Sequence, residues 1–287
     1  MKRTMGAALA VLALGGSLLV AAPTSADEER GRGFGASTEE LWGPDPTPNQ
    51  TKKQARAESR QLAETAARKK PWFRKRFARE RAKFGARDRS PRRIKHVHEL
   101  QYRLRWVNVY NGPVTGYYGK KTRKAVRRFQ RRVNLKRTGV ANRRTWRKLI
   151  PRSVRGRKHI PRACKSNKSN GPHICYNRRL HEVTLWRSGK LWNAWLVRGG
   201  SRSAKTRKGN FKVYWRNKDH ISSLYGSPMP HSQFFSGGQA FHGSTFMMDP
   251  FSGHSHGCVN MYLEDAAQLW VLTLKRKPKV HVRGKWD

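Results

Sequence analysis

Acidic residues and cysteines are scarce in this sequence. Asp and Glu total 17, against 63 Lys and Arg, so the formal net charge is +46 over 287 residues. A field of this sign attracts polyanions, and the attraction weakens as salt is added. The basic residues are spread along the chain instead of gathering on one recognition helix, which argues against base-specific reading of a nucleic acid. We therefore expect anionic polymers as partners and no specific nucleic acid. A compositional bias without a partner is the alternative.

Long apolar runs are also scarce, since the sequence has one, Met5 to Ala22. Lys2 and Arg3 precede it, and Thr24-Ser25-Ala26 follows with the small residues of a cleavage site. This order predicts a signal peptide over 1–26. The run is just long enough to span a bilayer, so an uncleaved anchor is the alternative. We predict a secreted, extracytoplasmic protein with no transmembrane segment after signal removal. Outside the cell the available polyanions include anionic wall polymers.

The three cysteines stand at positions 164, 175 and 258. In an oxidising compartment an even number can pair, and the odd one is left as a free thiol. Cys164 and Cys175 are separated by ten residues rich in Lys, Ser, Asn, Gly and Pro, a composition suited to a loop closed by a disulfide. We predict that these two pair and that Cys258 is free.

Cys258 lies in the stretch that carries the chemistry of this chain. Phe241-His242-Gly243-Ser244 is followed, after ten residues, by Ser255-His256-Gly257-Cys258-Val259-Asn260. A thiol catalyst needs a thiolate, a base that generates it, and donors for the oxyanion. Cys258 can supply the thiol, His242 the base, and the backbone at Gly257 a donor, because glycine leaves that turn uncrowded.

This stretch has two other interpretations. Zinc could be bound by side chains of the types that it prefers, namely His242, His254, His256 and Cys258. No known zinc spacing fits them, so we expect no metal and no other cofactor. Cys258 could also be a buried structural cysteine, but that does not account for the His-Gly and Ser-His-Gly-Cys around it.

The stretch resembles the catalytic motif of the L,D-transpeptidase (YkuD) family. That motif has His-Gly upstream, then Ser/Thr-x-Gly-Cys, an apolar residue, and Asn or Arg. The resemblance covers about Cys175 to Val282 and implies a mainly β, YkuD-like sandwich. It also implies that Cys258 is the acylated nucleophile and that His242 accepts and returns its proton.

The resemblance assigns further roles around this pair. A backbone carbonyl near Gly243 or Ser244 would orient the ring of His242. The backbone of residues 256–258 would hold the oxyanion, and the side chain of His256 would shape the groove. Asn260 would brace the turn. We predict substrate contacts from both sides of the groove: Ser244, Ser255, Asn260, Tyr225, Met229, Phe235 and Gly238.

Residues 93–151 contain an internal half-repeat. In each copy the Gly of a Thr-Gly turn precedes another Thr by six residues, and a helix follows; the pairs are Gly116 with Thr122 and Gly139 with Thr145. About sixty residues bury only a small core. We predict that this core contains Val126, Phe129, Val133, Trp146 and Leu149.

This pattern, together with Leu100-Gln101 and Phe129-Gln130, resembles the peptidoglycan-binding type 1 domain. The resemblance implies a three-helix bundle that docks on the glycan or the stem peptides of the cell wall. Tyr117 and Tyr118, on the first glycine loop, are the predicted surface contacts.

Composition and periodicity assign the other segments. Residues 27–92 are predicted to be a basic spacer, disordered where Gly and Pro are frequent and helical from about 50 to 83, and to act as a solvated tether. Residues 152–174 link the bundle to the catalytic domain at 175–287. The predicted elements of that domain are strands at 181–186 and 191–197, an irregular stretch over 218–238, a helix at 262–274 and a strand at 279–282. The resemblance to the L,D-transpeptidase family implies that 218–238 forms a lid over the active-site groove. The predicted fold class is α+β and multidomain, with a three-helix bundle before a mainly β sandwich.

The two resemblances together imply a secreted cell-wall L,D-transpeptidase whose partners are peptidoglycan stem peptides and glycan. Cys258 would take the acyl group of a stem tetrapeptide, with release of D-Ala, and pass it to an amine of a neighbouring stem, which makes a 3→3 cross-link. With water as acceptor the enzyme would be an L,D-carboxypeptidase, and with a protein amine an anchoring enzyme. A wall-binding protein that keeps the fold without catalysis is the alternative of another class, and a secreted nucleic-acid-binding protein is a third.

Overall fold

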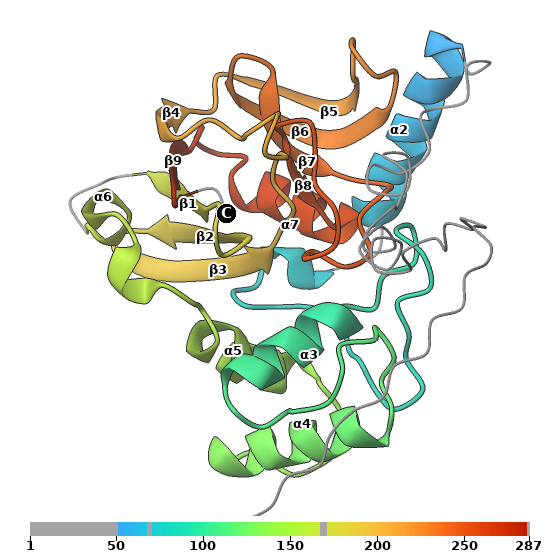
Figure 1. Ribbon diagram of the computed structural model, residues 1–287, viewed down its shortest axis with the longest axis vertical. Helices are drawn as coiled ribbons and strands as arrows, with labels where there is room; N and C mark the ends of the chain where they lie inside the picture. Colours follow the sequence, from blue (N-terminus) through green and yellow to red (C-terminus); the bar gives the residue numbers. More distant parts are fainter. Residues whose placement is uncertain (1–50, 68–70, 167–170, 286–287) are drawn as a thin grey trace, which may run out of the picture. The chain divides into compact units, whose positions relative to one another are not determined.

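The computed structural model describes residues 51–67, 71–166 and 171–285 (Figure 1). The predicted signal peptide at 1–26 and the first part of the predicted spacer lie outside the described residues. In the described part of the chain, no helix has both the length and the apolar character that a membrane span requires.

The C-terminal part of the chain contains two β-sheets (Figure 1). The first has the strand order β3-β2-β1-β9-β4, in which β1 and β9 are parallel and the other neighbours antiparallel. Its strands are β1 (Pro172–Asn177), β2 (Glu182–Arg187), β3 (Lys190–Leu196), β4 (Gly209–Lys212) and β9 (Lys279–Arg283). The second has the order β5-β6-β7-β8, with β7 and β8 parallel. Its strands are β5 (Trp215–Ile221), β6 (Pro228–Ser236), β7 (Gln239–Gly243) and β8 (Val259–Met261).

The two sheets share an apolar core with helix α7 (Leu263–Leu272). The first sheet contributes residues such as Ile174 and Trp195, and the second contributes residues such as Phe241 and Val259, all of them fully buried. Side chains that alternate along each strand meet in this layer. The predicted mainly β sandwich is confirmed.

The other face of the first sheet is covered as well. Trp186 on β2 and Leu191 and Ala194 on β3 belong to a second buried cluster, which includes Leu104 and Trp146 from the helical module. Because both of its faces are buried, β2 has no exposed residue. This cluster packs the helical module directly against the sheet.

Three helices form that module, and they confirm the predicted three-helix bundle. They are α3 (Val97–Trp106), α4 (Lys120–Arg132) and α5 (Arg143–Arg152). The predicted core residues Val126, Phe129, Trp146 and Leu149 are fully buried, and Val133 is partly buried against them.

The half-repeat has a physical basis in two glutamines. The side-chain oxygen of Gln101 accepts bonds from the backbone N–H groups of Thr115 and Gly116, at 2.9 and 3.0 Å. The side-chain oxygen of Gln130 accepts one from Gly139 at 2.9 Å. Gly116 and Gly139 have φ angles of +65° and +67°, a left-handed conformation that glycine adopts without strain. Each copy therefore uses one glutamine to close one glycine turn.

One of the two predicted surface tyrosines is not at the surface. Tyr118 is fully buried, and its hydroxyl donates to the carbonyl of Gly139 at 2.8 Å. The prediction of Tyr118 as a wall contact is therefore wrong, because neighbouring residues of an extended segment face opposite sides. Tyr117 is 37% exposed, and the guanidinium of Arg87 lies 4.8 Å from its ring centroid.

The stretch predicted to be a spacer contains a helix, as expected, but it is not a solvated tether. Helix α2 (Lys52–Ala67) contacts β5, β6 and α7 (Figure 1). The short helix η1 (Pro71–Arg74) follows, and Phe73, Phe77 and Arg79 are buried. The prediction failed because this segment is buried with few apolar residues and with an arginine whose charge has buried partners.

Arg79 belongs to a buried network of charges. Its Nε lies 2.7 Å from Glu99 and 3.4 Å from Asp265, and Glu99 also bonds Arg103 at 2.7 Å. Burial alone would raise the pKa of Glu99, but the charges of Arg79 and Arg103 lower it to about 2. His96 joins through Asp265 at 3.1 Å. The network ties the segment before α3 to α3 and α7.

The predicted disulfide is present. Cys164, in the short helix α6 (Arg162–Lys165), is bonded to Cys175 on β1, and Cys258 is free. The predicted linker around Cys164 also contains the short helix η2 (Arg157–His159).

Residues 218–238, predicted to be irregular, form most of the antiparallel hairpin β5–β6. Its turn at 222–227 is called the lid below. Every residue of β6 from Pro228 to Phe235 is buried, so the strand shows no polar–apolar alternation from which it could be predicted. The predicted hairpin at 181–197 is confirmed as β2–β3, and the predicted last helix and strand are α7 and β9.

Candidate active site

The parallel pairing of β7 with β8 brings the two predicted catalytic residues to neighbouring strand positions (Figure 1). His242 is on β7, opposite Asn260 of β8, and Phe241 is opposite Val259. Cys258 immediately precedes β8. His242 and Cys258 line the same groove. They are sixteen positions apart in the sequence, and the register of β7 on β8 brings both of them to one groove.

A backbone carbonyl orients His242, as predicted. Its Nδ1 lies 2.9 Å from the carbonyl oxygen of Gly243. A carbonyl can only accept, so Nδ1 carries the proton and Nε2 is the basic nitrogen. The side chain of Asn260 also bonds His242. Burial lowers the pKa of His242 to about 4, so the ring is neutral at neutral pH.

Cys258 is half-buried, and its thiol is also neutral at rest. The Sγ atom donates a weak bond to the carbonyl of Gly238 at 3.8 Å. Burial raises the pKa of Cys258 to about 11, and a bond from the backbone of Ala240 opposes the shift only in part. The groove therefore holds a neutral thiol and a neutral imidazole.

The turn before Cys258 is held by Ser255. Its hydroxyl donates to the carbonyl of Cys258 at 2.5 Å and accepts from the N–H of Gly257 at 3.1 Å. Gly257 has a φ of +117°, and a Cβ there would lie 2.6 Å from the side-chain nitrogen of Gln239. Only glycine fits this position. Because the N–H of Gly257 already has an acceptor, the backbone N–H of Cys258 is the better candidate for an oxyanion donor.

A segment that sequence reasoning missed supports this turn from behind. The backbone N–H groups of Arg198 and Asn260 each donate to the other's carbonyl, at 2.9 and 2.8 Å, and the N–H of Ser255 donates to the carbonyl of Gly199 at 2.8 Å. A Cβ on Gly200 would lie 2.7 Å from the Cα of Gly257. The signal in the sequence was the Gly199-Gly200 pair after a strand, which often marks a close approach of two backbones.

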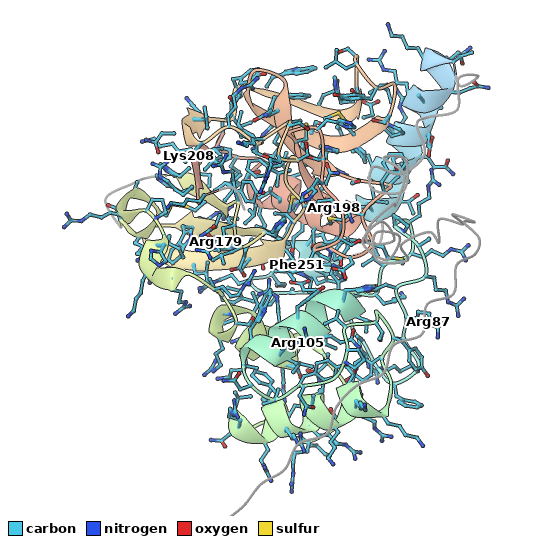
Figure 2. All side chains as sticks on the ribbon, viewed as in Figure 1. Arg87, Arg105, Arg179, Arg198, Lys208 and Phe251 are labelled. Atoms are coloured by element: carbon cyan, nitrogen blue, oxygen red, sulfur yellow. A yellow bond between two sulfur atoms is a disulfide. The ribbon has the colours of Figure 1, made fainter. Side chains whose placement is uncertain are left out.

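Arg198 also fixes the long loop between β7 and β8. Its guanidinium donates to the carbonyls of Phe246 and Asp249 at 3.3 and 2.8 Å. Figure 2 labels both Arg198 and Phe251, a residue of the loop that Arg198 holds. Desolvation lowers the pKa of Arg198 to about 10, which still leaves it charged at neutral pH.

The groove has a volume of about 450 Å³. Its walls are the lid, the start of β6, the turn between β6 and β7, and the residues around His242 and Cys258. Most of the predicted substrate contacts line it: Ser244, Ser255, Asn260, Tyr225, Met229 and Gly238. His256 lines it too, and Tyr225 of the lid stacks on its ring. Gly243 and Gly257 support the groove from behind without lining it.

Phe235 does not line the groove, so its prediction as a substrate contact is wrong. It is 3% exposed and packs in the sandwich core, with its ring centroid 4.8 Å from that of Phe241. Phe234, its neighbour on β6, faces the groove instead. Successive strand residues point to opposite faces, and the register that decides between Phe234 and Phe235 could not be read from the sequence pattern.

Comparisons with known proteins agree with this geometry. Residues 171–282 match the family model described as the L,D-transpeptidase catalytic domain, and residues 94–149 match the one described as "Putative peptidoglycan binding domain". No curated protein matched the chain.

Solved structures of similar proteins were also found. An L,D-transpeptidase from Stackebrandtia nassauensis is 22% identical, with a TM-score of 0.45; the match covers 74% of this chain and 97% of that one. An L,D-transpeptidase from Xylanimonas cellulosilytica is 25% identical, with a TM-score of 0.40 and coverage of 72% and 98%. On the family matches, the chain carries an L,D-transpeptidase (YkuD) catalytic domain at 171–282 and a peptidoglycan-binding domain before it, at 94–149.

Proposed function

We propose that this enzyme forms 3→3 cross-links in peptidoglycan with Cys258 as nucleophile and His242 as base. The observation that carries the proposal is the register of β7 on β8, which sets a carbonyl-oriented histidine and the free thiol in one groove. In the first step, Nε2 of His242 takes the thiol proton as sulfur attacks the carbonyl of the third residue of a stem tetrapeptide. The C–N bond then breaks, His242 returns the proton to the amine of D-Ala, and a thioester remains on Cys258.

The oxyanion of this step would be held by the backbone N–H of Cys258. Removing one donor of this kind costs about 2.7–4 kcal/mol in other acyl transferases. The bonds from Ser255 on either side of that N–H fix the turn before substrate arrives, so the donor does not have to be reorganised during the reaction.

In the second step an amine of a neighbouring stem attacks the thioester. His242 takes a proton from that amine, the C–S bond breaks, and the thiol regains the proton. The amide bond to the acceptor completes the cross-link, and the neutral thiol of Cys258 and the neutral ring of His242 are regenerated.

Features in the rest of the chain support a location of this chemistry at the wall. The peptidoglycan-binding domain packs on the first sheet, so binding to glycan or stem peptides would hold the groove near its substrate. The predicted signal peptide would deliver the chain to the outside of the cell. The net charge of +46 would add attraction to anionic wall polymers.

Product analysis tests the proposal. Purified protein is incubated with a stem tetrapeptide donor and a second stem that carries a free amine, and the products are separated by mass. The proposal predicts a 3→3 linked dimer and one D-Ala for each dimer, with neither formed by Cys258→Ala. D-Ala release without a dimer would make the enzyme a carboxypeptidase, and a dimer formed by Cys258→Ala would contradict the assigned nucleophile.

A further inference from the structure

The active-site groove is electrostatically unlike the rest of the protein. Lys and Arg make up 63 of the 287 residues, so a lining of 23 residues would carry about five of them at the average frequency. The 23 residues that line the groove include one, Arg207, and no Asp or Glu. Burial lowers the pKa values of His220, His242 and His254 on the same walls, so these rings are neutral at neutral pH. Arg207 is therefore the one permanent charge among the residues that line the groove.

Arg207 lies close to the nucleophile through the turn between β6 and β7. Its Nη1 donates to the carbonyls of Ser236 and Gly237, at 2.8 and 3.2 Å. The thiol of Cys258 contacts the carbonyl of the next residue, Gly238. Consecutive Cα atoms are ~3.8 Å apart, so the guanidinium and the thiol are held by adjacent peptide units of one turn.

Gln239, at the start of β7, holds the backbone of Arg207. The backbone N–H of Arg207 donates to the side-chain oxygen of Gln239 at 2.8 Å, and the side-chain nitrogen of Gln239 donates to the carbonyl of Lys205 at 3.0 Å. That same nitrogen is the atom nearest to a Cβ built on Gly257, so Gln239 lies between Arg207 and the turn before Cys258. The backbone and the guanidinium of Arg207 are thus both held by residues of the β6–β7 hairpin.

One edge of the guanidinium remains available to a ligand. Nη1 is used by the turn, whereas Nε and Nη2 have no acceptor in the described part of the chain. These two groups form the planar fork that binds a carboxylate with two parallel bonds. Because Nη1 is already bonded to the turn, the guanidinium is held in place and loses less side-chain entropy when it binds a carboxylate.

We propose that Arg207 binds a carboxylate of the donor stem peptide. The proposal rests on the proposed function, because the donor of that reaction ends in D-Ala. Its terminal carboxylate is separated from the scissile carbonyl by one residue, about the spacing of adjacent peptide units. A carboxylate on a stem side chain offers the same chemistry, and the test separates the two sources.

The test compares three donors with the full-length protein: the natural tetrapeptide, its terminal carboxamide, and the peptide with its side-chain carboxylates amidated. With the natural donor, Arg207→Gln should raise KM about tenfold or more, the size expected for a lost charge-assisted bond, with little change in kcat. Wild type should lose a similar factor with one of the amidated donors, and Arg207→Gln should not distinguish that donor from the natural one. The donor that behaves in this way identifies the carboxylate. Arg207→Lys should recover part of the loss, since it keeps the charge without the fork.

Two controls separate binding from support of the turn. Lys208→Gln makes the same charge change at an exposed neighbour that does not line the groove (Figure 2), and it should leave KM unchanged. The rate at which iodoacetamide alkylates Cys258 should be the same in wild type and Arg207→Gln, because that reagent has no carboxylate. Equal losses of Arg207→Gln with all three donors, or no loss with any, would overturn the proposal.

A binding measurement keeps this test separate from the proposed function. The Kd of the tetrapeptide is measured by calorimetry on Cys258→Ala protein, with and without Arg207→Gln. The proposal predicts that Arg207→Gln weakens binding about tenfold even if no turnover is observed. An unchanged Kd would overturn it, whereas absence of turnover in wild type would overturn only the cross-linking function.

Discussion

Tyr225 stacks on His256, with ring centroids 4.3 Å apart and ring planes inclined by 22°. Tyr225 belongs to the lid, and His256 lies two residues before Cys258. The contact therefore joins the lid to the catalytic turn across the groove that both residues line. The ring of His256 therefore forms part of the groove wall, and its role in shaping the groove for substrate stays a prediction.

Removing this contact should weaken catalysis without unfolding the protein. An aromatic pair is worth about 0.5–1.5 kcal/mol beyond its buried area, so Tyr225→Ala should lower kcat/KM for a tetrapeptide about two- to tenfold. Tyr225→Phe keeps the ring and should stay near wild type. Leu274→Ala, at an exposed position outside the groove, is the matched control. Equal activity of Tyr225→Ala and wild type would show that the stack does not shape the groove.

The neutral pair predicts an unusual reactivity of the free thiol. Because burial raises the pKa of Cys258 to about 11, its alkylation by iodoacetamide should be slow at pH 7 and should rise with pH into the alkaline range. Turnover follows His242 instead, whose pKa is lowered to about 4. Turnover should therefore hold as pH falls from 7 and disappear as pH falls through about 4, where the base becomes protonated. An alkylation rate that is already at its plateau at pH 6 would indicate a thiolate–imidazolium pair in the resting enzyme.

The buried charge network predicts a large stability effect far from the groove. Glu99→Gln should destabilise the protein by about 3–5 kcal/mol, because it leaves the buried guanidiniums of Arg79 and Arg103 without their shared carboxylate. Glu58→Gln removes a partner of Arg92 at the surface, and it should cost less than about 1 kcal/mol. Urea unfolding of both variants measures the difference. If Glu99→Gln lowered the free energy of unfolding no more than Glu58→Gln does, Glu99 would not be the carboxylate that compensates the buried charges of Arg79 and Arg103.

The disulfide should support the fold and leave the chemistry alone. It closes a short loop, with a sequence separation of 11 between Cys164 and Cys175, and loops of this size contribute about 3 kcal/mol. The double variant Cys164→Ala/Cys175→Ala should therefore unfold at lower urea and still be alkylated at Cys258. Non-reducing peptide mapping that finds both cysteines as free thiols in the wild type would reject the pairing.

The free thiol and the turn that holds it could be predicted from the sequence because their determinants are local. The residue types and their order in Ser255 to Asn260 define the turn, and a single glycine at 257 satisfies its left-handed φ. The segment that supports the turn could not be predicted in this way. The Gly199-Gly200 pair indicates a close approach of two backbones, but it does not identify Gly257 as the partner, because the two segments meet only after the chain has folded.

The missed features share a physical cause. Phe234 and Phe235 are both aromatic, so only the register of β6 decides which one faces the groove. The segment around Arg79 was predicted to be solvated because it is strongly basic, and its burial depends on carboxylates that lie 20 or more positions away in the sequence. The register of β6 and the burial of Arg79 both depend on contacts between residues far apart in the sequence, which local sequence patterns do not specify.

The most direct test of the central claim is the intact mass of the purified protein mixed with a stem tetrapeptide and no acceptor amine, with released D-Ala assayed alongside. The account predicts a mass gain equal to the acyl group, mapped to Cys258, and D-Ala released in step with it. A folded protein with Cys258 reduced that shows neither an adduct nor D-Ala would contradict the account and favour a wall-binding protein without catalysis.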